Sequence, residues 1–245
     1  MPTRKNRHLK RNMAIAVAAI SVMIVAVFAG LSSGLFTGSS NPAPEPISTT
    51  TNGTGLVGVK VGDIFTYKLT GSSVLGSPDV VTPEELSQYN DTDYYQVTVT
   101  GVGSSTVMLE TMWRFTNGTV VNGYQTIDLS NGRETDPNGF WGVYASNISV
   151  KDLLHPAGSD GLTVNKTEII AFANSNRVTN YWSTYSQYID KSDPTGNTFR
   201  NEFVGVYFDK QTGMLYNSTH IEFYTDPMIQ LVITWQLTSS TAWAI

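Results

Sequence analysis

The stretch Ile229-Gln-Leu-Val-Ile-Thr-Trp-Gln-Leu237 decides the fold, because its hydrophobicity alternates with a period of two. Its odd-numbered positions are all apolar, whereas Gln230, Thr234 and Gln236 are polar. Successive side chains of a strand point to opposite faces. The pattern therefore predicts a strand with one buried face, which is typical of an antiparallel sheet.

The same alternation returns along most of the chain after Val57. Further strands are expected near 65–69, 95–99, 107–115, 164–172, 177–188, 202–208 and 214–224. Asn117-Gly118 and the segment Asp209 to Gly213 predict hairpin turns, the first leading into a partner strand that runs to about Leu129. The predicted fold is mainly β: a large, curved antiparallel sheet, half-barrel or sandwich-like, with about eight or nine strands.

Two short helices are expected besides the strands. Thr82-Pro-Glu-Glu85 predicts a helix to about Tyr89, with Thr82 as N-cap and proline at the first helical position. Ser149 to Leu154 predicts a second helix, which ends at His155-Pro156. Both are expected to cover the concave face of the sheet.

The N-terminal region carries an apolar run, residues 13–36, that contains no charged residue and is long enough to cross a bilayer. Basic residues precede it and indicate a cytoplasmic N-terminus; they are Arg4, Lys5, Arg7, Lys10 and Arg11. We therefore expect a single-pass protein of the cell membrane. Its parts are a basic cytoplasmic tail (1–12), a transmembrane helix or signal anchor (13–36), a Ser/Thr/Pro stalk (37–55) and an extracytoplasmic β-rich domain (56–245).

Two other interpretations of the run stay open. Val27-Phe28-Ala29 before Gly30 would suit a cleaved signal peptide, although the apolar core is longer than a usual signal. A pilin-type leader, cut after Lys10-Arg11, would instead place the helix in a filament core. The length of the run favours the retained anchor.

Charge and cysteine content exclude several functions. Five of the 15 Lys and Arg residues precede the apolar run, so ten face 20 Asp and Glu in the rest of the chain, a net charge of −10. Such a surface repels phosphate backbones and makes nucleic acid an unsuitable partner. The chain has no cysteine, which excludes thiol nucleophiles, Cys-type zinc sites and a lipid-modified cysteine.

Six N-glycosylation sequons lie on the expected outer side, which indicates a glycoprotein. Their acceptor residues are Asn52, Asn90, Asn117, Asn147, Asn165 and Asn217.

The sequence holds no catalytic motif, and we expect neither enzymatic activity nor a cofactor or metal. Among the acids, Glu110 and Glu202 stand out because both fall within predicted strands, but Glu110 has the parity of an outward residue. His220 and Glu222 share a strand face, yet two ligands do not make a zinc site. The loops at 90–93 and 128–136 offer oxygen ligands for calcium without the spacing of a known calcium loop.

The segment around residues 181–188 is dense in aromatic side chains. Its members, on both parities of a predicted strand, are Tyr181, Trp182, Tyr185 and Tyr188. They cannot all point inward, so some aromatic surface is expected to remain exposed, and such surfaces tend to bind partners. Sugars or lipids would suit it.

Two short segments carry a family resemblance. Val59 to Tyr67 and the hairpin Tyr207 to Leu215 resemble archaeal membrane-anchored surface proteins of unknown function. The second segment also resembles hairpins of lipoprotein-carrier half-barrel domains, a likeness that implies a curved sheet able to hold acyl chains. This chain departs from those carriers in its anchor and in its lack of long lid helices.

These observations together predict a non-catalytic cell-envelope protein whose outer domain binds envelope proteins, glycans or lipids, or has a structural role. The alternatives are a half-barrel that binds a hydrophobic ligand and a filament or surface-layer subunit. A carbohydrate-active hydrolase fits least well.

Overall fold

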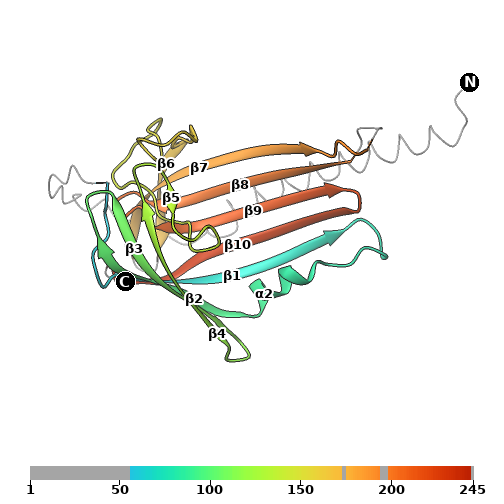
Figure 1. Ribbon diagram of the computed structural model, residues 1–245, viewed down its shortest axis with the longest axis horizontal. Coiled ribbons are helices and arrows are strands. Elements are labelled where there is room, and N and C mark those ends of the chain that lie inside the picture. Colours follow the sequence, from blue (N-terminus) through green and yellow to red (C-terminus); the bar gives the residue numbers. More distant parts are fainter. Residues whose placement is uncertain (1–55, 173–174, 194–197, 244–245) are drawn as a thin grey trace, which may run out of the picture. The chain divides into compact units, whose positions relative to one another are not determined.

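The computed structural model describes residues 56–172, 175–193 and 198–243, and these form a ten-stranded antiparallel sheet (Figure 1). The mainly β, antiparallel prediction is confirmed. The strands are β1 (Ile64–Leu75), β2 (Thr92–Val102), β3 (Thr106–Phe115), β4 (Val120–Asp128), β5 (Arg133–Glu134), β6 (Lys166–Phe172), β7 (Ser175–Ile189), β8 (Phe199–Asp209), β9 (Leu215–Thr225) and β10 (Met228–Ser240).

The predicted tail, membrane span and stalk lie outside the described residues, as does Asn52. Within the described ranges, no helix has the length and apolar character needed to cross a membrane.

The strand order is β5-β4-β3-β2-β1-β10-β9-β8-β7-β6. Two meanders therefore meet where β1 pairs with β10, from Phe65 opposite Ser240 to Leu75 opposite Ile229. The chain passes from β5 at one edge to β6 at the other through residues 135–165, which we call the crossover loop. The described strands form one open sheet, so the sandwich-like alternative is wrong for this part of the chain.

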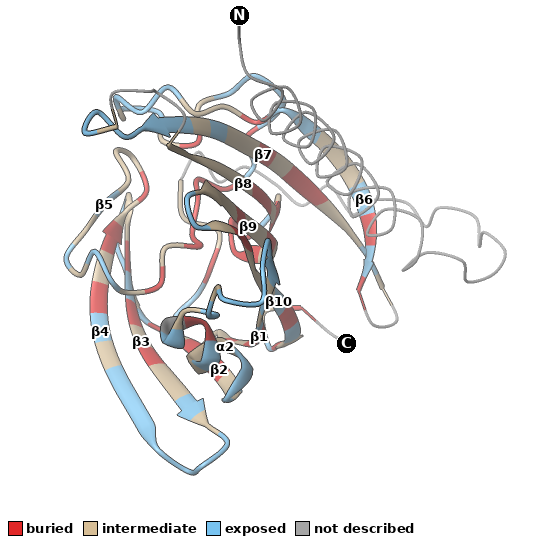
Figure 2. Ribbon diagram, turned by 90° about the vertical axis from the view of Figure 1, so that its right-hand side faces the viewer, coloured by how far each residue is buried: buried red, intermediate tan, exposed pale blue. Residues whose placement is uncertain are grey.

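One face of the sheet carries the core. In one row across five strands, the pairing aligns Leu69, Trp235, Ser218, Val206 and Trp182, whose side chains must share a face. We call this the inner face. Figure 2 shows the sheet curving around the crossover loop and around α2 (Ser87–Asn90), which lie on its concave side.

The crossover loop covers part of the inner face. The ring of its Phe140 lies 5.3 Å from that of Tyr67, and Tyr144 lies 4.7 Å from Phe208, all four being buried. The loop backbone is fixed because the Tyr144 amide donates to the Gly213 carbonyl at 2.9 Å. The buried side-chain amide of Gln125 donates to the Phe140 carbonyl. A loop thus fills the core position for which helices were expected.

The first expected helix exists but begins differently. It consists of a 3-10 turn, η1 (Glu84–Leu86), followed by α2. The assignment of Thr82 as N-cap is wrong: the cap position is Pro83, without a side-chain cap, and the Thr82 hydroxyl lies 2.8 Å from that of Ser73.

The second expected helix is wrong. Residues 149–154 form turns, and Leu153 makes an antiparallel bridge with Thr163. Lys151 has a φ of +76°, which interrupts a right-handed helix. His155, where this helix was expected to end, has its Nδ1 2.8 Å from Asp160 Oδ2.

Both predicted hairpin turns are confirmed. Gly118, between β3 and β4, has a φ of +85°, and Gly213, between β8 and β9, has a φ of +77°. Glycine adopts this region without steric cost.

Asp209, at the end of β8, holds the second turn together. One carboxylate oxygen accepts hydrogen bonds from the amide and hydroxyl of Thr212, at 2.8 and 2.9 Å. The other lies 2.8 Å from Arg177 of β7, whose guanidinium packs 4.4 Å from the ring of Trp243. Asp209 is only 1% exposed, so its charge depends on these partners.

We expect Asp209→Ala to lower the free energy of unfolding by about 3 kcal/mol or more, because Arg177 would lose its carboxylate partner. Urea unfolding of the full-length protein, followed by tryptophan fluorescence, measures this. Glu168→Ala is the matched control, since it removes a partly exposed carboxylate that pairs with Lys166 and should cost less than about 1 kcal/mol. Equal losses would contradict the role given to Asp209.

Buried tyrosines make the fold sensitive to alkali. Burial raises the pKa of Tyr144 and of Tyr67 above that of an exposed tyrosine. The unfolded chain, with a tyrosine pKa of about 10, therefore loses these protons first as the pH rises. Stability is retained below pH 10 and falls above it.

We expect urea unfolding of the full-length protein to show this loss between about pH 10 and 11. Tyr144→Phe should make the loss shallower, because it removes one of the perturbed phenols. An unchanged slope in this variant would show that Tyr144 does not carry the effect.

Candidate functional site

The rest of the inner face is hollowed. Two adjoining cavities of about 410 and 680 Å³ lie along β9 and β10, bounded by η1–α2 and by the start of the crossover loop. They share four lining residues, Gln88, Tyr89, His220 and Ile233, so we treat them as one inner groove.

The wall of the inner groove is rich in apolar and aromatic side chains. Tyr95 packs against Trp235 at 4.9 Å and against Trp113 at 5.8 Å, while Tyr89 lies 6.1 Å from Trp113. The aromatic lining residues are Tyr89, Tyr95, Trp113, Trp141, Trp182, Tyr224 and Trp235, and the aliphatic ones include Leu86, Ile229, Leu231 and Ile233. Trp113, Trp141 and Trp235 remain partly exposed, so this surface is accessible to a ligand.

The helical segment η1–α2 borders the inner groove because of Gly71 on β1. The pairing of β1 with β2 ends at Tyr67, which leaves the backbone of Gly71 free on that side. Asn90 takes the place of a strand partner: its Oδ1 accepts from the Gly71 amide at 2.9 Å and its Nδ2 donates to the Gly71 carbonyl at 2.8 Å. A Cβ at Gly71 would come within 2.9 Å of Leu86, so only glycine allows this close packing.

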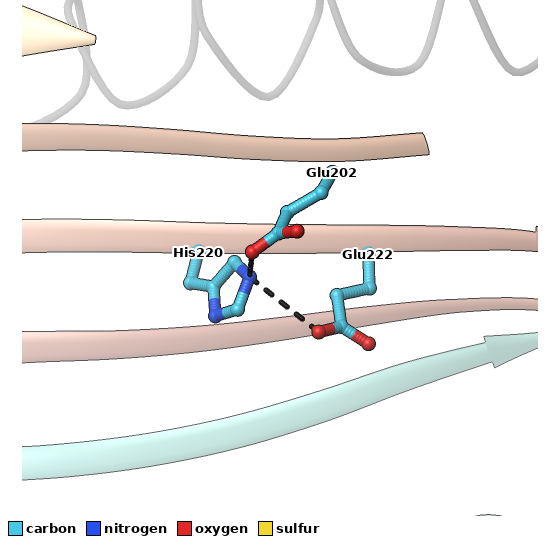
Figure 3. Close-up of side chains that lie close together, drawn as sticks. All are labelled: Glu202, His220 and Glu222. Carbon is cyan, nitrogen blue, oxygen red and sulfur yellow. Dashed lines mark hydrogen bonds and ion pairs between the residues drawn. The ribbon is translucent and has the colours of Figure 1, made fainter. Parts of the chain in front are cut away.

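A polar cluster borders the same groove, which His220 and Glu222 line. His220 Nε2 is 2.9 Å from Glu202 Oε1 and 3.5 Å from Glu222 Oε1 (Figure 3). Glu202 of β8 lies directly opposite Glu222 of β9, and Val204 lies opposite His220, so regular pairing brings the three side chains together. In the described part of the chain, this is the one group of three such side chains close enough to share a metal ion.

Arg200 and Tyr224 complete the polar end. Arg200 lies 3.5 Å from Glu202 and 3.8 Å from Glu222, and its guanidinium stacks 4.5 Å from the ring of Tyr188. The Tyr224 hydroxyl donates to Glu222 Oε2. Burial and this hydrogen bond raise the pKa of Tyr224, which keeps its proton at neutral pH. The two carboxylates and the one guanidinium together carry a formal charge of −1.

The expectation for His220 and Glu222 covered only part of this cluster. The sequence placed these two on one face, and the structure adds Glu202 as a third possible ligand. The period-two alternation of β8 could have predicted that Glu202 lies on the same face as Val206. Its position opposite Glu222 also depends on the register shift between Tyr207 and Phe208, which the sequence pattern does not reveal.

The four aromatic residues of β7 divide between the two faces. Trp182 lies on the inner face, is 7% exposed and lines the inner groove. Tyr188 shares that face and contacts Arg200. Tyr181 lies on the outer face, 4.6 Å from Tyr207, and Tyr185 is 62% exposed. The structure therefore does not bring the four into one surface.

The described sequon asparagines differ in their surroundings. Asn117, Asn147 and Asn165 are exposed. Asn90 is also exposed, but its side-chain amide is hydrogen-bonded to the backbone of Gly71. Asn217 is half-buried within β9.

The remaining candidate acids have other roles. Asp93 pairs with Arg114, and Asp128 accepts hydrogen bonds from Ser130 and Asn131 within its own loop. Glu110 lies on the outer face, where it accepts from Tyr124. Glu110 and Glu202 thus face opposite sides of the sheet and cannot act on one substrate.

The sequence matches no protein-family model, and no curated protein is significantly similar to it. The described part of the chain is an open antiparallel β-domain with an apolar groove and a charged cluster.

The attachment of η1–α2 to β1 is testable. Asn90→Ala removes two hydrogen bonds, which should cost roughly 1 kcal/mol and accelerate amide exchange in residues 84–91 about fivefold. Hydrogen exchange of the full-length protein measures this. Asn117→Ala, which removes a sequon at a hairpin tip, should leave that segment unchanged; an equal acceleration would contradict the attachment.

Proposed function

We propose that this chain is a non-catalytic binding protein of the cell envelope whose β-domain holds a hydrophobic or amphipathic ligand in the inner groove. The observation that carries the proposal is the composition of the groove. Aliphatic and aromatic side chains line most of it, and the charged cluster around His220 lies on its β8–β9 side.

The size and chemistry of the inner groove fit this role. Pockets for small molecules are concave, mainly apolar, usually about 300–1,000 Å³, and contain a few polar groups that fix orientation. The two cavities, of about 410 and 680 Å³, lie within that range. A ligand with an apolar chain would pack against Leu231 and Ile233 and place a polar end beside His220.

The sequence pattern supports the location. The basic flank of the apolar run at 13–36 favours an anchor with the β-domain outside the cell. The acidic outer region and its sequons suit that side of the membrane. The resemblance of the hairpin Tyr207 to Leu215 to half-barrel lipid carriers agrees with a curved sheet that binds acyl chains.

Assembly through a sheet edge is the second candidate. Within the described residues, β6 pairs only with β7, and Ile169 on this edge strand is 68% exposed. Free edges can accept a strand from another chain, as a filament or surface-layer subunit would require.

Photo-crosslinking tests groove binding. We expect a long-chain fatty acid bearing a diazirine to label peptides that contain residues 229–235 of the full-length protein. Ile233→Trp should reduce this labelling at least about fivefold, because Ile233 lines both cavities and an indole would fill their junction.

Val232→Trp is the matched control, since its neighbouring position on β10 faces the other side of the sheet. This variant should be labelled as the wild type is. Equal effects of the two variants, or wild-type labelling confined to residues 13–36, would refute the proposal.

A further inference from the structure

We propose that Glu202, His220 and Glu222 bind a divalent transition-metal ion, for which Zn²⁺ is the best probe. The three side chains offer one imidazole nitrogen and two carboxylate oxygens, a donor set that suits zinc. This site is independent of the hydrophobic ligand, because it rests only on the geometry of the cluster.

The spacing of the donor atoms suits a small ion. Zinc binds histidine nitrogen at about 2.0–2.1 Å and carboxylate oxygen at about 2.0–2.2 Å, so two ligands of a tetrahedral ion lie about 3.3 Å apart. His220 Nε2 lies 2.9 and 3.5 Å from the two Oε1 atoms, and no two of the three donors are more than 4.8 Å apart. Small side-chain rotations would place all three on one ion.

Neighbouring groups hold the carboxylates in this orientation. Glu222 turns its Oε2 toward the hydroxyl of Tyr224, and Glu202 turns its Oε2 toward Arg200 at 3.5 Å. The Oε1 atoms are thereby directed toward His220, as Figure 3 shows. Groups outside the ligands commonly orient metal-binding side chains in this way.

The backbone also favours a preformed site. Glu202 and Glu222 are a directly opposed pair on β8 and β9, and His220 is two residues from Glu222 on the same face. Ligands carried by paired strands of a sheet keep their spacing better than ligands carried by loops. All three side chains are partly exposed, and His220 and Glu222 line the inner groove, so an ion could enter and keep positions open for water or a ligand.

An ion-pair network around Arg200 is the competing explanation. The Arg200 guanidinium lies 3.5 and 3.8 Å from the two carboxylates, beyond the 2.7–2.9 Å of a tight charge-assisted hydrogen bond. The shortest contact among these charged groups and His220 is instead the 2.9 Å hydrogen bond between His220 Nε2 and Glu202 Oε1, which joins two of the proposed donor atoms. One guanidinium also leaves the two carboxylates with a net charge of −1, which attracts a cation.

Titration of the full-length protein with Zn²⁺ alone tests the proposal. The protein should carry a purification tag without histidine and be stripped with a chelator first. We expect isothermal titration calorimetry to give one saturable site per chain, which His220→Ala and the near-isosteric Glu202→Gln weaken about 100-fold or more.

His155→Ala is the matched control, because it removes a histidine outside the cluster, one that pairs with Asp160, and should leave the affinity unchanged. Zn²⁺ should also raise the unfolding temperature of the wild type but not that of Glu202→Gln, whose own unfolding temperature reports whether it folds. Absence of saturable binding to the wild type, or binding that both cluster variants retain, would overturn the proposal and leave the ion-pair network.

Discussion

The structure depends on how one apolar face of a single sheet is kept from water. Ten strands with alternating side chains produce an inner face rich in large hydrophobic residues, but the described part of the chain has only seven helical residues with which to cover it. The crossover loop provides most of the cover by packing Phe140 and Tyr144 against Tyr67 and Phe208. The strand order requires a connection between opposite edges of the sheet, and this loop makes it across the inner face.

The same constraint accounts for the inner groove. The crossover loop packs on Tyr67 and Phe208, while η1–α2 is held to β1 by Asn90 and Gly71. Between these covers, β9 and β10 keep an uncovered stretch in which Ile233 joins two cavities. The charged cluster lies there because the pairing of β8 with β9 places Glu202, His220 and Glu222 on the inner face. A proposed ligand site and a proposed metal site thus share one uncovered region.

Much of the fold could be predicted from the sequence. The period-two pattern from Ile229 to Leu237 and the turn glycines Gly118 and Gly213 are local signals, and strands and hairpins follow from them. The segment 149–154 resembled a helix because its composition allows one, but the packing of Leu154 in the core and the bridge to Thr163 favour an irregular path. The junction of β1 with β10 and the position of Glu202 beside His220 depend on distant pairing and a register shift, which no local pattern specifies.

Hydroxyl-radical footprinting of the full-length protein is the most direct test of a half-covered inner face. Tyr67, which is buried against Phe140 of the crossover loop, should be oxidised at least about tenfold more slowly than Tyr124, which is 71% exposed on the outer face. Trp113 and Tyr224, in the inner groove, should react at intermediate rates. Oxidation of Tyr67 as fast as that of Tyr124 would show that the loop does not cover the sheet and would contradict this architecture.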